Sequence, residues 1–330
     1  MKDLSHMRAL AKADQKRVQI KRLIKKGYTL CDMHVHTRFS DSYTRVRRLL
    51  KKAEKKGIGL AITDHNEIGG VLRAYELGTN VMVIPGIEVS SAEGPHILVY
   101  FSKVEELTEF YKRHVEPAKN KNPHTNTKLS IPELLQVAQA YDSVVSIAHP
   151  YSPAYTHVPK GIKKGYILPD MLKSVHAVEV INGAMTKGMN NKAMEFADEL
   201  SCGITGGSDS HSLFEFGKVV TYANAGTIPE FLDCIKNKQS FVRGAPVNQL
   251  QRMPSIAKSG QKHMPYLVPS LGQRYEQIVV RPMRYHKPMI VNKLTVISNE
   301  SKQVIRNPLP AAKLIYKPLG VVVKKFNNGK

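Results

Sequence analysis

The stretch LCDMHVHTRFSDS (residues 30–42) ends an apolar run with two histidines one residue apart, followed by an aspartate five residues later. Because side chains alternate between the two faces of a strand, we expect His34 and His36 on one face and Val35 on the other. Two imidazoles on one face can bind one metal ion, and Asp41 would lie nearby. A histidine pair at a strand end is also compatible with ordinary, partly exposed polar residues, so the remaining sequence has to distinguish the two interpretations.

The composition indicates a globular protein of the cytoplasm. The chain has 330 residues, enough to bury a sizeable core, alone or with an appended module. Its three cysteines, Cys31, Cys202 and Cys234, form no CxxC pair, which argues against a disulfide framework and a cysteine zinc site. The N-terminal segment has no uninterrupted apolar stretch of the kind found in signal peptides, and no later run approaches the roughly 20 apolar residues of a membrane span. We therefore expect a cytoplasmic location and no membrane span.

The net charge of +22 is concentrated in the two ends of the chain. Residues 1–28 carry nine Lys or Arg against two acidic residues, and residues 245–330 carry fifteen against two, whereas residues 29–244 carry 25 against 23. A nearly neutral central unit between basic ends favours a polyanionic partner, such as single-stranded nucleic acid. A solvated charged surface explains the same excess equally well.

Three regions follow from the pattern of apolar residues. Residues 1–28 are basic, and a helix over residues 4–26 would end at Gly27. Residues 29–244 contain seven strand-like apolar runs that alternate with helical patterns or loops, which indicates a mostly parallel α/β fold, possibly a barrel. The seven runs are YTLCDMHV, IGLAITDH, VMVIPGIEV, HILVYF, SVVSIAH, HAVEVI and CGITGGSD. Residues 245–330 are interrupted by prolines but keep strand-like runs such as EQIVV and LGVVV, so we expect a small β-rich appendage.

Two of the expected helices have recognisable ends. In residues 44–57, Thr44 is a candidate N-cap and Gly57 a stop signal. In residues 130–142, Ser130 is the expected cap and Glu133 occupies the capping-box position. Both helices follow strand-like runs, as the connections of a mostly parallel sheet should.

Potential metal ligands lie at the ends of six of the seven runs. In α/β sheets, the loops at the carboxyl ends of strands carry ligands and catalytic groups, and so many such residues at these ends are hard to ascribe to chance. The nine candidates are His34, His36, Asp41, His65, Glu88, His96, His149, Asp209 and His211. Asp64 can orient a ligand or cap the following turn. Glu179 and Asn182 end the sixth run and can line the site without binding metal.

The motifs DMHVHTRFSDS, AITDHN, GIEVSS, HILVY, IAHP and GGSDSH, in this order, resemble the PHP (polymerase and histidinol phosphatase) family of metal-dependent phosphoesterases. The resemblance spans residues 29 to about 222 and implies a distorted seven-stranded (β/α) barrel of PHP type. It also implies three divalent metal ions, and imidazole and carboxylate ligands suit Mn, Zn or Fe. By this resemblance, the first ion is held by His34, His36, Glu88 and Asp209, the second by Glu88, His96 and His149, and the third by Asp41, His65 and His211.

The resemblance implies a phosphoesterase that hydrolyses a phosphomonoester, or a nucleotide or oligonucleotide phosphate, through attack by a metal-bound hydroxide. Glu88, His149 and Asp209 are the expected catalytic residues, because each holds an ion that activates water or neutralises charge. Arg45 and Lys218 follow site motifs and are candidates for binding the substrate phosphate, with solvated surface charges as the alternative. Two other functions stay open: a nucleic-acid-binding protein that uses the PHP unit as a scaffold, and a small-metabolite phosphatase of the histidinol phosphatase type.

Overall fold

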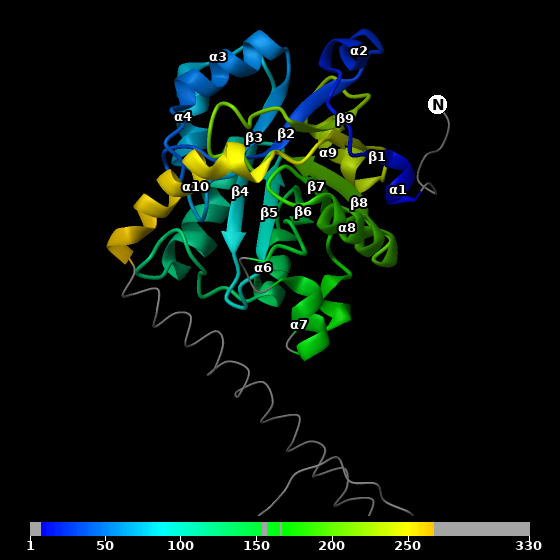
Figure 1. Ribbon diagram of the computed structural model, residues 1–330. Coiled ribbons are helices and arrows are strands. Elements are labelled where there is room, and N and C mark those ends of the chain that lie inside the picture. Colours follow the sequence, from blue (N-terminus) through cyan, green and yellow to red (C-terminus); the bar gives the residue numbers. More distant parts are fainter. Residues whose placement is uncertain (1–7, 154–156, 166, 267–330) are drawn as a thin grey trace, which may run out of the picture. The chain divides into compact units, whose positions relative to one another are not determined.

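The computed structural model describes residues 8–153, 157–165 and 167–266, which form an α/β unit around one curled sheet (Figure 1). The sheet has ten strands in the order β1-β10-β9-β2-β3-β4-β5-β6-β7-β8. The strands are β1 (Ala13–Asp14), β2 (Thr29–Val35), β3 (Gly59–Ile62), β4 (Val83–Ser90), β5 (His96–Phe101), β6 (Ser143–Ile147), β7 (Ala177–Asn182), β8 (Gly203–Gly207), β9 (Val219–Ala223) and β10 (Phe241–Gly244).

The seven predicted runs correspond to β2 through β8, which are neighbours in the sheet in chain order. Strands β2, β3 and β4 are parallel, as are β6, β7 and β8, while β5 runs antiparallel to β4 and β6. A parallel bridge between Val35 and Ser210 brings the end of β2 next to the chain that leaves β8. The curled sheet and this bridge are consistent with a distorted barrel of PHP type.

The sheet has ten strands rather than the predicted seven, which corrects the sequence-based expectation. Strands β1, β9 and β10 extend the sheet beyond β2, and β9 pairs antiparallel with both β2 and β10. With two and four residues, β1 and β10 are too short to show a recognisable alternation of apolar and polar residues. Strand β1 also pairs with β10, where Ala13 lies opposite Val242, so only the tertiary structure defines it.

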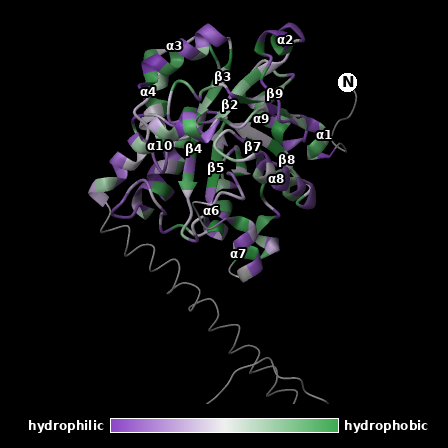
Figure 2. Cartoon of the chain, in the orientation of Figure 1, coloured by the Kyte–Doolittle hydropathy of each residue, from purple (hydrophilic) through white to green (hydrophobic). Residues whose placement is uncertain are grey.

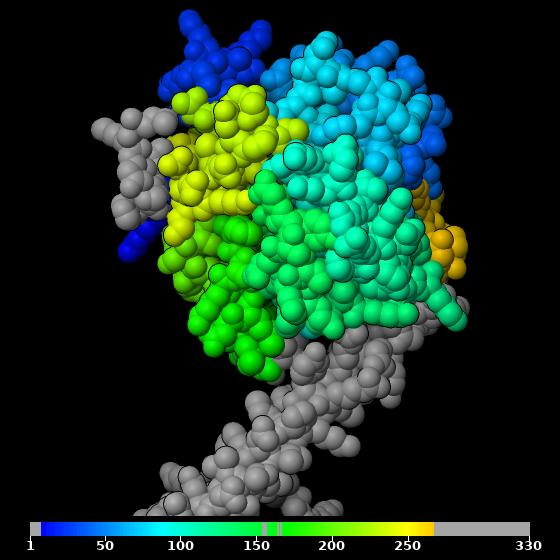
Figure 3. Space-filling model, turned by 180° about the vertical axis from the view of Figure 1, so that it is seen from behind, coloured from blue at the N-terminus to red at the C-terminus, as the bar shows by residue number. Residues whose placement is uncertain are grey.

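Helices cover the outside of the curled sheet. Seen from behind, the covering segments follow one another around the molecule in chain order, as the colours from cyan through green to yellow show (Figure 3). The α-helices are α1 (Ala9–Lys12), α2 (Ile20–Lys25), α3 (Val46–Lys56), α4 (Gly69–Leu77), α5 (Val104–Phe110), α6 (Ile131–Ala138), α7 (Val158–Lys164), α8 (Lys187–Glu199), α9 (Ile228–Lys236) and α10 (Gln249–His263). Shorter turns are the π-helix η1 (Tyr111–Val115) and the 3-10 helices η2 (Glu116–Ala118), η3 (Pro169–Leu172) and η4 (Met264–Tyr266).

Local sequence explains where two of these helices begin and end. Ser130 caps α6 in a capping box with Glu133, as predicted. Gly57 ends α3 in the left-handed conformation, at φ 65°. The N-cap of α3 is Arg45 instead of Thr44, whose hydroxyl donates to a backbone carbonyl of the loop that follows β8.

The single helix predicted over residues 4–26 is wrong for the described part of this segment. Helices α1 and α2 are separated by β1, whose backbone pairs with β10 and does not continue a helix. Leu23 of α2 is buried, while Lys21, Arg22 and Lys25 are exposed. The basic residues of α2 therefore lie on the surface.

Apolar residues concentrate on the strands and hydrophilic residues on the surrounding helices (Figure 2). Every residue of β3 through β8 is buried. Among the described residues, no helix is both long and apolar enough to cross a membrane. Past residue 244 the described chain forms α10, and the predicted strand-like runs EQIVV and LGVVV lie outside the described residues. The division of the chain at residues 28 and 244 stays a prediction.

Candidate metal centre

The nine predicted ligands converge at one edge of the curled sheet. Strands β2, β3, β6 and β8 end at this edge, and β5 begins there with His96, because it runs antiparallel to β4. Eight of the nine residues are buried, and His211 is partly buried. Their possible ligand atoms form four overlapping groups, each with all atoms within 4.8 Å of one another. The groups are His36, Asp41, His65 and His211; His34, His36 and Glu88; His34, His149 and Asp209; and His65, Glu88 and His96.

Glu88 lies at the centre of the cluster. Its Oε1 is 2.9 Å from His96 Nδ1 and 3.1 Å from His149 Nε2. Its Oε2 is 3.2 Å from His34 Nε2 and 3.4 Å from His36 Nε2. The two oxygens of one carboxylate thus face two different pairs of imidazoles, which is the arrangement of a carboxylate that bridges two cations.

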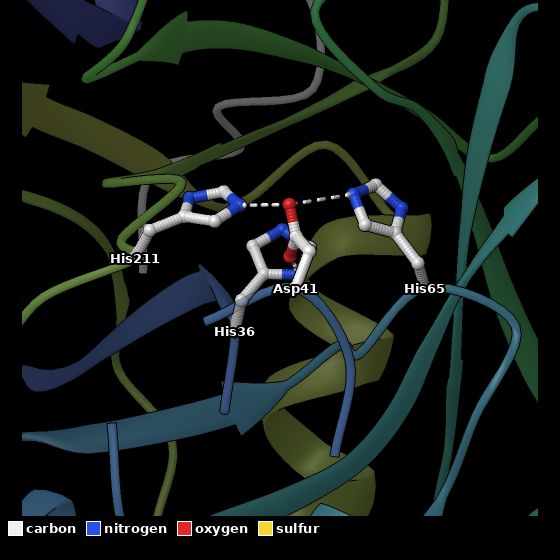
Figure 4. Close-up of side chains that lie close together, drawn as sticks. All are labelled: His36, Asp41, His65 and His211. Carbon is white, nitrogen blue, oxygen red and sulfur yellow. Dashed lines mark hydrogen bonds and ion pairs between the residues drawn. The ribbon is translucent and has the colours of Figure 1, made fainter. Parts of the chain in front are cut away.

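A neighbouring group forms around Asp41 (Figure 4). Asp41 Oδ2 lies 2.9 Å from His211 Nε2 and 3.9 Å from His65 Nε2. The ring of His36 stacks on both histidines, with centroids 4.6 Å from His65 and 4.4 Å from His211. His65 also places Nδ1 3.0 Å from Glu88 Oε2 and so links this group to the centre of the cluster.

The ligand atoms of β2 and of the chain after β8 are spaced as the ligands of one ion would be. The Nε2 atoms of His34 and His36 are 3.0 Å apart, and Asp209 Oδ1 lies 3.8 Å from the first and 3.3 Å from the second. Nitrogen or oxygen ligands about 2.1 Å from one transition-metal ion lie roughly 3 to 3.4 Å from each other. Two of the three distances match this spacing, and the distance from His34 to Asp209 is about 0.4 Å longer, so the three side chains could share one ion after a small adjustment.

Four buried atoms of the cluster form no well-directed hydrogen bond within the described residues, although two of them, His65 Nδ1 and Glu88 Oε2, lie 3.0 Å apart: His36 Nδ1, Asp41 Oδ1, His65 Nδ1 and Glu88 Oε2. Burying a polar atom without a partner costs about 1–3 kcal/mol. Cations between these atoms would satisfy them, and nitrogen and oxygen donors without any thiolate suit Zn, Mn or Fe. The residues present therefore fit the metal ions that the sequence resemblance implies.

The histidines of the cluster differ in the direction in which their surroundings shift the pKa. Burial lowers the pKa of His36 and of His96 to about 4, so both imidazoles are neutral near pH 7. Burial also disfavours charge on Asp41 and His211, but each residue stabilises the charged form of the other more strongly. The pKa of His211 therefore rises to about 9, and the pKa of Asp41 falls well below its usual range. Neutral imidazoles and ionised carboxylates are the forms that bind metals. His36, His96 and Asp41 are therefore already in the binding form near pH 7, whereas a cation would have to displace a proton from His211.

Comparison with known proteins agrees with this geometry. Residues 32–200, about half of the chain, match the PHP domain, and residues 187–240 match the PHP-associated family. The chain belongs to the PHP family. Over 232 residues it is 27% identical to the uncharacterized protein MJ0417 of Methanocaldococcus jannaschii, an alignment that covers 67% of this chain and 84% of that protein. Over 63 residues it is 40% identical to the phosphoribosyl 1,2-cyclic phosphate 1,2-diphosphodiesterase of Eggerthella lenta, covering 18% of this chain and 24% of that enzyme.

Two solved structures share the PHP fold of this chain. PsfC from Pseudomonas syringae PB-5123 has a TM-score of 0.50 at 18% identity, covering 73% of this chain and all of that one. A lesion-specific endonuclease from Pyrococcus furiosus has a TM-score of 0.51 at 17% identity, covering 65% of this chain and 57% of that one. At these identities the likeness shows the fold alone.

Asp32 opens the motif DMHVHTRFSDS, but the sequence analysis assigned it no role; in the structure it is a buried residue that positions ligands. Its carboxylate accepts hydrogen bonds from the backbone N–H groups of Ser208 and Gly217, both at 2.8 Å, and so fixes the chain that carries Asp209. Burial raises the pKa of Asp32 to about 6. The available signal was its position two residues before His34, on the same face of β2.

Glu179 and Asp64 support the PHP ligands from outside the four groups. Glu179 Oε1 is 3.0 Å from His34 Nδ1, and Oε2 accepts a hydrogen bond from the backbone N–H of His149 at 2.9 Å. Asp64 accepts hydrogen bonds from the N–H and hydroxyl of Thr37, at 2.7 and 2.6 Å. It therefore holds the loop that leads to Asp41 and does not cap the turn after β3. Asn182 donates to Glu179 and to Asp209, at 2.9 and 3.3 Å.

The two cations proposed from sequence to bind substrate lie on the surface. Arg45 is the exposed N-cap of α3. Lys218 is also exposed, and its Nζ is 4.5 Å from the ring centroid of Phe214. Their role in substrate binding stays a prediction.

Three other side chains, without any motif in the sequence, lie beside Asp41. His263 Nε2 is 3.9 Å from Asp41 Oδ2, and Lys262 Nζ donates to the carbonyl of Ser40 at 2.7 Å. The ring centroid of His124 is 5.7 Å from that of His263. No motif surrounds His124 or His263 in the sequence, and both lie far from Asp41 in the chain, in the segment between β5 and β6 and on α10.

Two proposed ligands have an unusual backbone conformation. His149 has a φ of 24° and Asp209 a φ of 49°. Non-glycine residues rarely adopt this left-handed region, at a cost of order 1–3 kcal/mol each. The surrounding structure imposes these conformations. It includes the hydrogen bond that the backbone N–H of His149 donates to Glu179.

Proposed function

We propose that the protein is a phosphoesterase with three divalent metal ions, which hydrolyses a phosphomonoester, or a nucleotide or oligonucleotide phosphate. The observation that carries this proposal is the position of Glu88, whose carboxylate oxygens face two different pairs of imidazoles. Burying so many ionisable groups is costly. A protein that used the PHP unit only as a scaffold would have no need of them, so their burial supports a catalytic site.

The bound ions would supply a water molecule of lowered pKa and neutralise the phosphate oxygens. We assign Glu88, His149 and Asp209 as catalytic residues, because they would hold the ions that activate water or neutralise charge. Glu179 orients His34 so that Nε2, and not Nδ1, faces Glu88. Burial of these groups keeps bulk water out, which strengthens their interactions with charge that develops during the reaction.

For the substrate phosphate we propose contacts from His124, Lys262 and His263. These side chains lie beside Asp41 and offer nitrogen donors that suit phosphate oxygens. Arg45 and Lys218 stay candidates from the sequence, although both are exposed on the surface.

Elemental analysis of the Mn²⁺-reconstituted protein tests the metal assignment. We expect close to three ions per chain and turnover of p-nitrophenyl phosphate in the wild type. Glu88→Gln should lose two ions and activity, because one carboxylate serves both. The matched control is Asp142→Asn, whose carboxylate contacts Ser102 and Lys236. Fewer than one ion per chain in the folded wild-type protein would overturn the proposal.

Single-stranded nucleic acid is a second candidate substrate. It is supported by the basic ends of the chain and by the shared fold of the lesion-specific endonuclease. The small-metabolite phosphatase remains the alternative. We also propose a cytoplasmic location, supported by cysteines that are all free.

A further inference from the structure

Helix α10 lies beyond both regions that match the PHP families, the second of which ends at residue 240. One side of α10 is exposed, with Met253 at 58% and Ile256 at 46% of their full exposure. The opposite side carries Arg252 and Ser255, which are buried, and Ser259. This polar, inward-facing side contacts two loops that carry proposed metal ligands.

The first contact is with the loop after β8, through Glu215. This fully buried carboxylate accepts hydrogen bonds from Arg252 Nε at 3.0 Å and from the Ser255 hydroxyl at 2.7 Å. Its other oxygen accepts from the backbone N–H of His211 at 2.9 Å and from the hydroxyl of Ser212 at 3.0 Å. One side chain thus connects α10 with the backbone of His211.

The second contact is with the loop after β2. The Ser259 hydroxyl donates to Asp41 Oδ2 at 2.6 Å. Lys262 Nζ donates to the carbonyls of Arg38 and Ser40, both at 2.7 Å. Helix α10 therefore fixes both the carboxylate of Asp41 and the backbone that precedes it.

The two loops are also joined to each other, because the hydroxyls of Ser42 and Thr44 donate to the carbonyl of His211. Asp41 and His211 belong to the same proposed ion, the third. We propose that α10 positions these two ligands and that the third metal ion depends on it, while the first and second ions do not. This inference rests on the proposed function, since it concerns one of the three proposed ions.

Metal binding by variants of α10 tests the proposal. Ser259→Ala and Lys262→Met remove the contacts to the Asp41 loop without introducing bulk. At a buffered concentration of free Mn²⁺ that saturates the wild type, each variant should contain about one ion fewer, and its weakest Mn²⁺ site should bind at least tenfold less tightly. Ser259→Thr keeps the hydroxyl and should restore the ion. Met253→Ala and Ile256→Ala, on the exposed side, should match the wild type.

Variant and wild type are compared at equal free Mn²⁺. The difference in metal content and Mn²⁺ affinity between them therefore tests the role of α10. Equal metal content and affinity in Ser259→Ala, Lys262→Met and the wild type, with unchanged circular dichroism, would overturn it. An equal loss in Met253→Ala would overturn it as well, because the effect would then not be specific to the inward-facing side. The proposed function is judged separately, by the metal content and activity of the wild type alone.

Discussion

Gly207 sets how closely β8 approaches β2. A Cβ atom on Gly207 would lie 2.4 Å from both the Cβ and the backbone nitrogen of His34, which is closer than real Cβ contacts. The close approach lets the chain after β8 form its bridge with β2. The hydrogen atom of a glycine at this point therefore helps to place Asp209 beside His34.

We expect Gly207→Ala to lower the free energy of unfolding by about 1–3 kcal/mol, because the backbone of His34 cannot move aside as a flexible side chain would. It should also weaken binding of the first metal ion. Urea unfolding and metal titration measure the two effects. Gly188→Ala in α8, where an added Cβ meets nothing within 4 Å, is the control and should not destabilise the fold. An unchanged stability of Gly207→Ala would show that the strands can separate at no cost.

Among the seven predicted strands, β7 carries no proposed metal ligand, yet it supports the site. Glu179 on β7 contacts His34 of β2 and the backbone of His149 after β6. Strand β7, which lies between β6 and β8, thus contacts a ligand of β2 and the backbone of a ligand that follows β6. Side chains that orient a ligand in this way typically contribute 10–100-fold to metal affinity.

Glu179→Gln should therefore lower the affinity for the first and second proposed metal ions by 10–100-fold. The amide would hold the His34 ring less strongly, and its nitrogen cannot accept the hydrogen bond from the backbone N–H of His149. Competition with a chelator measures these affinities. Glu195→Gln, an exposed residue of α8, should leave them unchanged. Loss of the third ion alone would contradict the role assigned to Glu179.

The sequence allowed prediction of those elements that are defined by a pattern of neighbouring residues. Strands β2 to β8 correspond to apolar runs, and the nine candidate ligands lie within these strands or at most six residues after them. The role of α10 was not predictable, because Ser259 and Asp41 are 218 positions apart and no local pattern relates them. Strand β1 escaped prediction for the same reason, since it exists only by pairing with β10.

At the scale of the whole molecule, the basic ends and the near-neutral middle suggest separate tasks. Residues 267–330 carry twelve Lys or Arg against two acidic residues. If these cations bind a nucleic-acid backbone, they release condensed counterions, and affinity for single strands should depend on salt with a log–log slope of about −0.7 per phosphate contacted. The metal cluster and its supporting contacts all lie before residue 267.

A chain that ends at residue 266 should therefore hydrolyse p-nitrophenyl phosphate like the full chain but bind oligonucleotides more weakly and with a smaller salt slope. A chain that ends at residue 244 should also lose the third ion, because it lacks Ser259 and Lys262. Filter binding across a salt series measures the oligonucleotide affinity, and elemental analysis measures the metal content. Equal oligonucleotide affinity of the folded chain ending at 266 would favour a small phosphorylated metabolite as the substrate.

His149 and Asp209 have backbone conformations that glycine would adopt with less strain. A mutation to glycine at either position would relax the main chain and at the same moment remove a ligand. Selection for stability alone would thus favour glycine and remove a proposed metal ligand at each of these two positions. Where a homologue has lost the proposed metal site, nothing would oppose glycine at these two positions. Glycine at either position is therefore expected to mark homologues without this metal site.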